Sequence, residues 1–371
     1  MKFKCRKDEL IKGLNAVTKT VTTKTTLPIQ EGVLIETIES NIKLTTNDLE
    51  IGTEYIMTAD VLEGGATVVD LKTLNEIIRK IEADDIYFEV EQNIFIIKST
   101  SGVYKLQTMN PDEYKRLPVF NVDNRIEISQ KLFKDMVRKV VFAASVDPNR
   151  PVYTGVLVTI TGNVINVVAI DGFRMAVRKE LLDNYNSDFK AIIPAKVLTE
   201  VIKTLDDGEE KNIKIGVNKN QALFEMGNCT VVSRIIEGDF LNYSSVIPAE
   251  SSTKIRLNRK MLLEAIERVA IFSRDASEKD KKVPVRLTIT MDSLNVSCVS
   301  VTGDAKENIS VVVEGKEMEI GFNPRYLIEA FRAIDDDEIE LNFGSSVAPL
   351  IINPVSGNLY IYMVLPVKLK D

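Results

Sequence analysis

The segment Leu71-Lys72-Thr73-Leu74-Asn75-Glu76-Ile77-Ile78-Arg79-Lys80-Ile81 decides the architecture, because its pattern returns twice along the chain. Its leucines and isoleucines recur at the three- and four-residue spacing of an amphipathic helix. Similar segments lie at 195–205 and 324–334, and each is followed by an acidic turn and a short alternating strand. The equivalent leucines are Leu74, Leu198 and Leu327. Their separations are close to one third of the 371 residues, so three copies of one unit account for the chain.

Two further landmarks precede this helix in each unit. The first is another amphipathic helix, which we expect at 8–21, 130–144 and 259–273. The second is an apolar strand led by a proline. Pro28 and Pro151 are 123 residues apart, as are Gly32 and Gly155, whereas the third copy, at Pro284, lacks the glycine.

Each unit therefore consists of two helices and many short strands with polar turns. This composition is typical of an α+β domain whose helices pack on one face of an antiparallel sheet. The pattern restarts after residues 122 and 252, which predicts three domains at 1–122, 123–252 and 253–371. No long linker separates the copies, so we expect the domains to sit rigidly against one another.

The composition excludes several kinds of chemistry. The chain has a net charge of −7 and contains no histidine, so it has no histidine-based triad and no histidine-ligated zinc. Phosphate-binding and dinucleotide-binding glycine motifs are also missing. The cysteines, Cys5, Cys229 and Cys298, are scattered, which indicates thiols in a reducing compartment. With neither a secretory signal nor a membrane-length apolar run, we expect a soluble cytoplasmic protein.

The three second helices share one charge pattern, basic, acidic at i+4 and basic at i+7. The three sets are Lys72, Glu76, Arg79; Lys196, Glu200, Lys203; and Arg325, Glu329, Arg332. At 100° per residue, such positions lie within about 60° of one another on the helix surface. For a single helix this pattern indicates an ordinary solvated face with internal ion pairs. Its recurrence in register favours sequence-independent contact with phosphates of a nucleic acid.

The acidic turns at 84–85, 206–207 and 335–337 suggest an alternative, a two-metal catalytic centre. They recur at the same point of each unit, however, and would lie on three separate domains. Aspartates after a helix are also ordinary turn residues. Turn chemistry is therefore the favoured interpretation.

Several short motifs, spread over the whole chain, occur in a fixed order. They are Met1-Lys2-Phe3, Thr26-Leu27-Pro28-Ile29, Thr45–Glu50, Asp171-Gly172-Phe173-Arg174, Met318–Asn323 and Tyr362–Leu369. Because these motifs occur in this order and at matching spacing, the sequence resembles the bacterial DNA polymerase III beta subunits, the sliding clamps of replication. The resemblance implies a head-to-tail homodimer that closes a ring of six similar domains around duplex DNA, with the sheets outside and the helices inside. It also implies a processivity subunit with no catalytic site and no cofactor or metal.

The resemblance assigns DNA contacts to residues of the helices and of two loops. They are Lys24, Lys72, Arg79, Asn149, Lys196, Lys203, Arg325 and Arg332. In the loop that holds Asn149, Pro151-Val152 stands where the family often has two tyrosines.

A second implied site binds short peptide motifs of the polymerase alpha subunit, the clamp loader and repair polymerases. Its residues are Arg150, Tyr153, Ile170, Gly172, Phe173, Arg174, Met175, Leu241, Val246, Met363, Val364, Leu365, Pro366 and Val367. Phe173 replaces a frequent histidine and Leu241 a frequent proline. Without the resemblance, these apolar residues would be interpreted as ordinary core.

For the subunit interface, the resemblance pairs Tyr104 and Leu106 of the first domain with Ile271 and Phe272 of the third. The expected function is therefore a ring that slides on DNA and tethers a polymerase, with no membrane role. The alternative is a metal-dependent nucleic-acid-processing enzyme that uses the Asp48 or Asp171 carboxylate.

Overall fold

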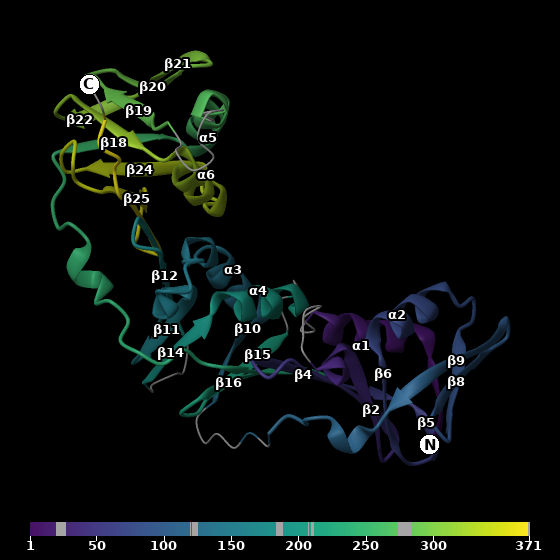
Figure 1. The fold of residues 1–371 in the computed structure, drawn as a ribbon. Helices are drawn as coiled ribbons and strands as arrows, with labels where there is room; N and C mark the ends of the chain where they lie inside the picture. The colour runs from purple at the N-terminus through teal and green to yellow at the C-terminus, as the bar shows by residue number, and fades with distance from the viewer. Residues whose placement is uncertain are drawn as a thin grey trace. The chain divides into compact units, whose positions relative to one another are not determined.

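The computed structural model describes residues 1–19, 27–118, 120, 125–182, 188–206, 208, 211–273 and 283–369 (Figure 1). They fall into two compact units. The first comprises Met1–Lys134 with Lys196–Ile235, and the second comprises Asp135–Ala195 with Ile236–Asp371. All strand pairs in both units are antiparallel, which confirms the predicted α+β class.

The first unit contains one thirteen-stranded sheet, in the order β10-β15-β16-β17-β4-β3-β2-β6-β9-β8-β7-β1-β5. Its strands are β1 (Lys2–Arg6), β2 (Gly32–Ile38), β3 (Asn41–Asn47), β4 (Ile51–Thr58), β5 (Asp60–Glu63), β6 (Ala66–Asp70), β7 (Asp85–Glu91), β8 (Ile94–Ser99), β9 (Gly102–Met109), β10 (Arg125–Ser129), β15 (Asn212–Val217), β16 (Gln221–Met226) and β17 (Cys229–Arg234). The helices are α1 (Lys7–Thr18) and α2 (Leu71–Lys80), with the larger parts of α3 (Gln130–Arg138) and α4 (Ala195–Thr204).

The second unit contains a nine-stranded sheet, in the order β14-β11-β12-β13-β26-β25-β24-β18-β22, and a four-stranded sheet, in the order β21-β20-β19-β23. The strands are β11 (Gly155–Thr161), β12 (Val164–Ile170), β13 (Arg174–Leu181), β14 (Phe189–Pro194), β18 (Thr253–Asn258), β19 (Val285–Ile289), β20 (Ser293–Ser300), β21 (Gly303–Ser310), β22 (Val312–Gly315), β23 (Met318–Phe322), β24 (Glu338–Phe343), β25 (Leu350–Pro354) and β26 (Tyr360–Val364). Its complete helices are α5 (Arg259–Val269) and α6 (Pro324–Ala333).

One pairing scheme occurs three times. The strand before the first helix of each repeat pairs with the strand after the second helix: β1 with β7, β10 with β15, and β18 with β24. The strand after the first helix pairs with its hairpin partner and with the strand that enters the second helix. These sets are β2 with β3 and β6, β11 with β12 and β14, and β19 with β20 and β23. The recurrence confirms the threefold repeat predicted from the sequence.

Helices α2 and α6 begin where the sequence supplies a capping side chain. Before α2, the Asp70 carboxylate accepts a hydrogen bond from the Thr73 backbone N–H at 2.7 Å. Before α6, Asn323 caps in the same way and Pro324 occupies the first turn, where its missing N–H has no cost. In Figure 1, α1 and α2 lie side by side, as do α5 and α6, and each pair is in contact. The apolar faces of the helices are buried in the cores.

The two equivalently spaced prolines do not begin strands, contrary to the prediction. Pro28 and Pro151 instead open short 3₁₀ turns, Pro28–Glu31 and Pro151–Thr154, and the strands begin one residue later at Gly32 and Gly155. Proline fixes φ and cannot donate to a strand ladder, so it suits a first helical turn. A Cβ on either glycine would lie 2.6 Å from a neighbouring side chain, which explains the recurring glycine.

All three first helices end earlier than predicted. The helix expected at 130–144 ends at Arg138, and the one expected at 259–273 ends at Val269. Each is followed by a 3₁₀ turn, at Val141–Ala143 and at Ala270–Ser273. β-Branched and aromatic residues around these ends have weak helix propensity, which the spacing of apolar residues does not reveal. The helix expected at 8–21 ends at Thr18, and residues 20 and 21 lie outside the described residues.

Continuous sheet joins successive repeats. In the first unit, β4 of the first repeat pairs with β17 of the second, with Thr53 opposite Val231. In the second unit, β13 of the second repeat pairs with β26 of the third, with Met175 opposite Met363. These ladders explain why the chain needs no long linkers.

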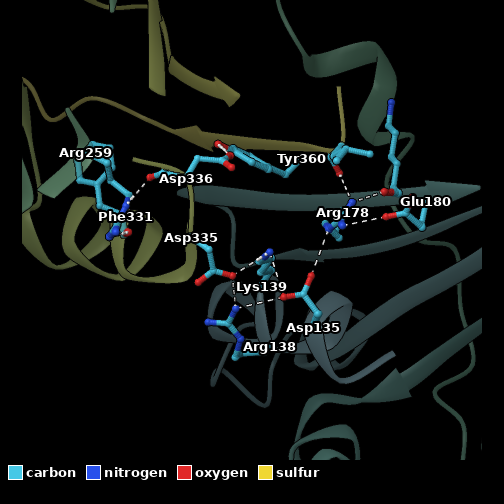
Figure 2. A network of polar contacts seen from close by, with 12 residues as sticks. Asp135, Arg138, Lys139, Arg178, Glu180, Arg259, Phe331, Asp335, Asp336 and Tyr360 are labelled. Carbon is cyan, nitrogen blue, oxygen red and sulfur yellow. Dashed lines mark hydrogen bonds and ion pairs between the residues drawn. The ribbon is translucent and has the colours of Figure 1, made fainter. Parts of the chain in front are cut away.

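Ion pairs reinforce the join between β13 and β26 (Figure 2). The Asp335 carboxylate, at the end of α6, lies 2.6 Å from the Arg138 guanidinium and 3.0 Å from the Lys139 ammonium. Asp135 pairs with the same two cations. In the same acidic turn, Asp336 accepts a hydrogen bond from the Tyr360 hydroxyl at 2.7 Å. This turn therefore connects two repeats, while Asp207 of the second acidic turn lies outside the described residues.

The Asp335 pairs predict an acid-sensitive contribution to stability. Burial alone would raise the pKa of Asp335, but the hydrogen bonds from Lys139 and Arg138 outweigh it and lower that pKa. A carboxyl with a lowered folded-state pKa stabilises the fold above its unfolded value and loses this effect as the pH falls through the folded value, hence below about pH 4.

We therefore expect Asp335→Asn to lower the free energy of unfolding at neutral pH by less than about 1 kcal/mol, because the carboxylate is 59% exposed. The difference from the wild type should shrink in acid. Denaturant unfolding over a pH series measures both effects, with Asp337→Asn in the same turn as the control. A difference that stays constant into acid would contradict the assignment.

Candidate functional site

The cationic stripes of the second helices are exposed as predicted. Lys72 and Arg79 on α2, Lys196 and Lys203 on α4, and Arg325 and Arg332 on α6 all lie at the surface. The leucines on the opposite faces, Leu74, Leu198 and Leu327, are buried. Each helix therefore presents a cationic surface while its apolar face holds it to the core.

The three stripes differ in how far their cations are neutralised. On α6, Arg325 pairs with Glu329 at 2.8 Å and Arg332 pairs with Glu267 at 2.7 Å. Within the described residues, Lys72 and Lys196 make no ion pair. On α4, Lys203 pairs with Glu200 at 2.8 Å. Since a carboxylate partner competes with a phosphate for the same cation, α2 is best suited to hold phosphates, α4 with one paired cation is next, and α6 with two is least suited.

The two loop positions assigned to DNA are less informative. Asn149 is exposed, but its side-chain amide donates to the Asp147 carboxylate at 2.9 Å, in a turn where Asp147 also accepts the Asn149 backbone N–H. Lys24 lies outside the described residues.

An apolar cluster in the second unit contains four of the fourteen residues assigned to the peptide site. Ile170, Met175 and Met363 are buried in it and Tyr153 packs against it. Met175 lies opposite both Ile170 on β12 and Met363 on β26, so pairing of the two repeats builds the cluster. The Tyr153 ring meets the edge of Phe240 at 5.9 Å between centroids. The sequence interpretation missed Phe240, although it directly precedes Leu241.

Segments that adjoin this cluster expose apolar side chains. Phe173 is 58% exposed, and Leu241, Val246 and Val367 are each exposed by more than a third. The backbone carbonyl of Phe173 accepts the N–H of Leu365 at 2.8 Å, which ties the Phe173 loop to the segment after β26. Pro366 follows Leu365 at an intermediate burial. An apolar floor with exposed apolar neighbours is the composition expected of a site for an apolar peptide.

Gly172 has a geometric reason to be glycine. Its φ is +94°, in the region that L side chains rarely adopt, and a Cβ there would lie 2.9 Å from the Arg150 guanidinium. The Arg150 side chain thus covers the backbone of the turn.

Arg174 has a different environment from its neighbour Met175. The side chains of successive strand residues point to opposite faces, so the Arg174 guanidinium lies away from the apolar cluster. It is buried and makes polar contacts with Asp171, Glu329 and the Phe142 carbonyl oxygen. The rings of Phe142 and Tyr326 stack on it at 5.3 and 4.6 Å. Val364, paired with Arg174, is also buried and outside the cluster.

These contacts connect the exposed Phe173 loop to helix α6. Asp171 Oδ1 accepts the backbone N–H groups of Phe173 and Arg174 at 2.9 and 3.0 Å, while its other oxygen accepts from Arg174 Nε at 2.9 Å. The Phe173 ring also stacks on Tyr326, with 6.3 Å between centroids. Arg174 therefore fixes this turn from the face of the sheet opposite the apolar cluster.

Both carboxylates of the metal-dependent alternative accept hydrogen bonds from backbone N–H groups of their own turns. Asp48 Oδ1 accepts the backbone N–H groups of Glu50 and Ile51 at 3.0 and 2.8 Å, as Asp171 does for its own loop. Among the described residues, no three cysteine, aspartate or glutamate side chains are placed to hold one metal ion. The structure therefore offers no support for that alternative.

Both segments assigned to the subunit interface include strand edges. Residues 102–107 of β9 pair with β8 alone among the described strands, and β21 is the last strand of its sheet. Tyr104 and Leu106 face the core of the first repeat and are only partly buried. Ile271 is 66% exposed, while Phe272 packs near Gly303 at the start of β21.

In the described part of the chain, no helix has both the length and the apolar character needed to cross a membrane.

Comparisons with known proteins agree along the whole chain. Three family models, described as the N-terminal, central and C-terminal domains of the DNA polymerase III beta subunit, match residues 1–118, 127–242 and 244–368. The beta sliding clamp of Halalkalibacterium halodurans is 30% identical, covering 99% of this chain and 100% of its own. The solved sliding clamp of Bacillus subtilis is 30% identical, with full coverage of both chains and a TM-score of 0.95. A structure described as a beta subunit from Eubacterium rectale is 32% identical, with the same coverage and TM-score.

The contacts of Arg174 predict a large cost for its removal. Arg174→Gln leaves the Asp171 carboxylate without its cation and Glu329 with Arg325 alone, so we expect a loss of about 3 kcal/mol in the free energy of unfolding. We also expect faster amide hydrogen exchange at Phe173 and Leu365. Arg234→Gln, at an exposed arginine, is the control. Unchanged exchange at both amides would contradict the positioning role.

Proposed function

The chain belongs to the DNA polymerase III beta subunit family, and from this premise we propose how it works as a DNA sliding clamp. Two copies join head to tail into a closed ring, duplex DNA passes through the ring, and the helices of the repeats face the DNA. The observation that carries the proposal is the cationic stripe repeated on α2, α4 and α6. Cations on rigid helices contact the phosphates and read no base edges, so the ring can slide.

The protein is a processivity subunit and not an enzyme, as its sliding-clamp relatives indicate. Its partners are DNA, the replicative polymerase and the clamp loader. A tethered polymerase returns to the primer end at a high effective concentration, so replication becomes processive with no chemistry from the clamp. The metal-dependent alternative is not supported. Such clamps act on DNA inside the cell, and we place this one in the cytoplasm.

We assign the domains to 1–122, 123–252 and 253–371. The limits of the three family models and the threefold pairing scheme support this division. Within each domain two helices and the antiparallel sheet share a core.

The ring closes through two of the described strand edges, residues 102–107 of β9 and the outer edge of β21. We place β9, with Tyr104 and Leu106, against β21 and the turn that carries Ile271 and Phe272. Unpaired strand edges readily accept another strand, and apolar side chains beside them would be covered in the dimer. The contact joins different surfaces, so it closes only if the rotation between copies permits, as in a two-membered ring.

The polymerase and the other partners bind through short peptide motifs at the apolar cluster around Met175 and Met363. The exposed apolar side chains of Phe173, Leu241 and Val246 support this assignment. Methionine side chains adapt to different shapes, which suits one site that serves several partners.

The DNA assignment predicts a strong charge dependence. Changing Lys72, Arg79, Lys196 and Lys203 together to glutamate should weaken binding to linear duplex DNA and flatten the dependence of its affinity on salt. The logarithmic slope should fall by about 0.9 for each phosphate that is no longer neutralised. Fluorescence anisotropy over a salt series measures both.

The matched control carries the same charge change on exposed strand and turn residues, Lys190, Lys214, Lys219 and Lys254. Equal effects of the two sets would contradict the helix assignment, since only general repulsion would then remain.

The peptide assignment predicts a separable defect. Phe173→Ser should lower the affinity for a synthetic peptide that carries a partner's clamp-binding motif by at least about tenfold, because the peptide no longer packs against an aromatic ring. The native mass should not change. Leu62→Ser, at a similarly exposed apolar residue, is the control. Peptide affinity that is retained would place the site elsewhere.

A further inference from the structure

A cleft in the first unit lies where the first and second repeats meet. Its volume is about 720 Å³, and residues of α1, β4, α4 and the β15–β17 hairpins line it. It includes Lys203 of the cationic stripe on α4. It also includes Asn15, whose carbonyl oxygen accepts a hydrogen bond from Arg79 of the stripe on α2. The cleft thus connects two of the surfaces assigned to DNA.

Four lysines line this cleft, and three of them have a carboxylate partner. Lys12 lies 2.7 Å from Glu9, Lys203 lies 2.8 Å from Glu200, and Lys211 lies 2.5 Å from Asp206. Lys19 differs, because no carboxylate within the described residues lies within ion-pair distance of its ammonium. Its Nζ donates to the backbone carbonyl oxygen of Lys203 at 2.8 Å.

The surroundings of Lys19 disfavour its positive charge. The pKa of Lys19 is lowered, chiefly by burial; Cys229 and the Glu200 carboxylate act to raise it, while the positive charges of Lys203 and Lys134 lower it. One carbonyl at a helix end is a weak counterpart for a half-buried ammonium beside other cations. An anion in the cleft would supply the missing negative charge, and a phosphate oxygen accepts a hydrogen bond from an ammonium particularly well.

Neutral donors complete the lining. Since Arg79 occupies the carbonyl oxygen of Asn15, the amide N–H groups of Asn15 remain for another acceptor. Asn228 also lines the cleft. A cleft lined by ammonium and amide groups is suited to a phosphate, whose several oxygens accept hydrogen bonds together.

We propose that this cleft seats one phosphate group, with Lys19 as its principal ligand and Lys203 and Lys12 beside it. The proposal rests on the function above, because the phosphodiester backbone of duplex DNA is the source of phosphate that this function supplies. Free inorganic phosphate has the same recognising chemistry and is the second source. A seat for a phosphate contacts no base, so it adds a discrete contact in each subunit and leaves binding independent of sequence.

The proposal separates a binding role of Lys19 from a purely structural one. If Lys19 only capped α4, Lys19→Met would destabilise the free protein. If Lys19 serves to bind an anion, Lys19→Met removes a charge that the fold disfavours. The free protein should then be as stable as the wild type or more stable, while phosphate binding is lost.

The experiment uses the full chain, with inorganic phosphate and a short linear duplex as separate probes. The wild type, Lys19→Met and the control Lys214→Met, at an exposed strand lysine, are compared. Thermal unfolding is measured with added phosphate against chloride of equal ionic strength, and duplex affinity by anisotropy. We expect Lys19→Met to keep the melting temperature in chloride, to lose any increase caused by phosphate, and to bind the duplex several-fold more weakly with a salt slope about 0.9 smaller.

Loss of duplex affinity without a phosphate effect in any variant supports the seat and identifies DNA as the source. Loss of the phosphate effect alone supports the seat and identifies free phosphate. Unchanged behaviour of Lys19→Met with both probes, or a lower melting temperature in chloride, overturns the proposal. If the quadruple charge reversal still abolishes duplex binding in that case, the clamp function stands without the seat.

Discussion

Antiparallel pairing between strands of successive repeats is the contact on which the other features depend. β4 with β17 and β13 with β26 carry a continuous ladder from one repeat into the next. Each ladder covers two strand edges that would otherwise be open to other chains. It also fixes the register, because a slip by one residue would turn every side chain to the opposite face. Successive repeats are thereby joined by ordinary strand pairing.

The register of β13 with β26 has a direct consequence for partner binding. It places Met175 opposite Met363 and so assembles one apolar cluster from two repeats. The same register puts Arg174 on the other face, where it contacts Glu329 of α6 and holds the turn that presents Phe173. Because side chains alternate along β13, Met175 forms part of the apolar cluster while its neighbour Arg174 fixes the adjacent turn. The Asp335 ion pairs with Arg138 and Lys139 strengthen this same joint.

Sequence periodicity predicted the features that are governed locally. The helices around Leu74, Leu198 and Leu327 follow from apolar spacing, and their exposed cations follow from the same geometry. Features that depend on tertiary contacts could not be predicted from the sequence. Pro28 begins a 3₁₀ turn because strand pairing starts only at Gly32, where the backbone closely approaches Val68. The place of Arg174 behind the sheet depends on Glu329, which is 155 residues away. Lys19 resembles any surface lysine in the sequence, and its partial burial and its neighbours Glu200, Lys203 and Lys134 follow only from the packing of the second repeat.

Topological retention on DNA tests the central claim most directly. The protein is loaded by a clamp loader onto nicked circular DNA, separated from free protein at a salt concentration that screens simple electrostatic binding, and followed after the circle is cut once. A closed ring should remain on the intact circle and slide off the ends of the linear product. Protein that stays bound after linearisation, or that leaves the intact circle equally fast, would contradict the account.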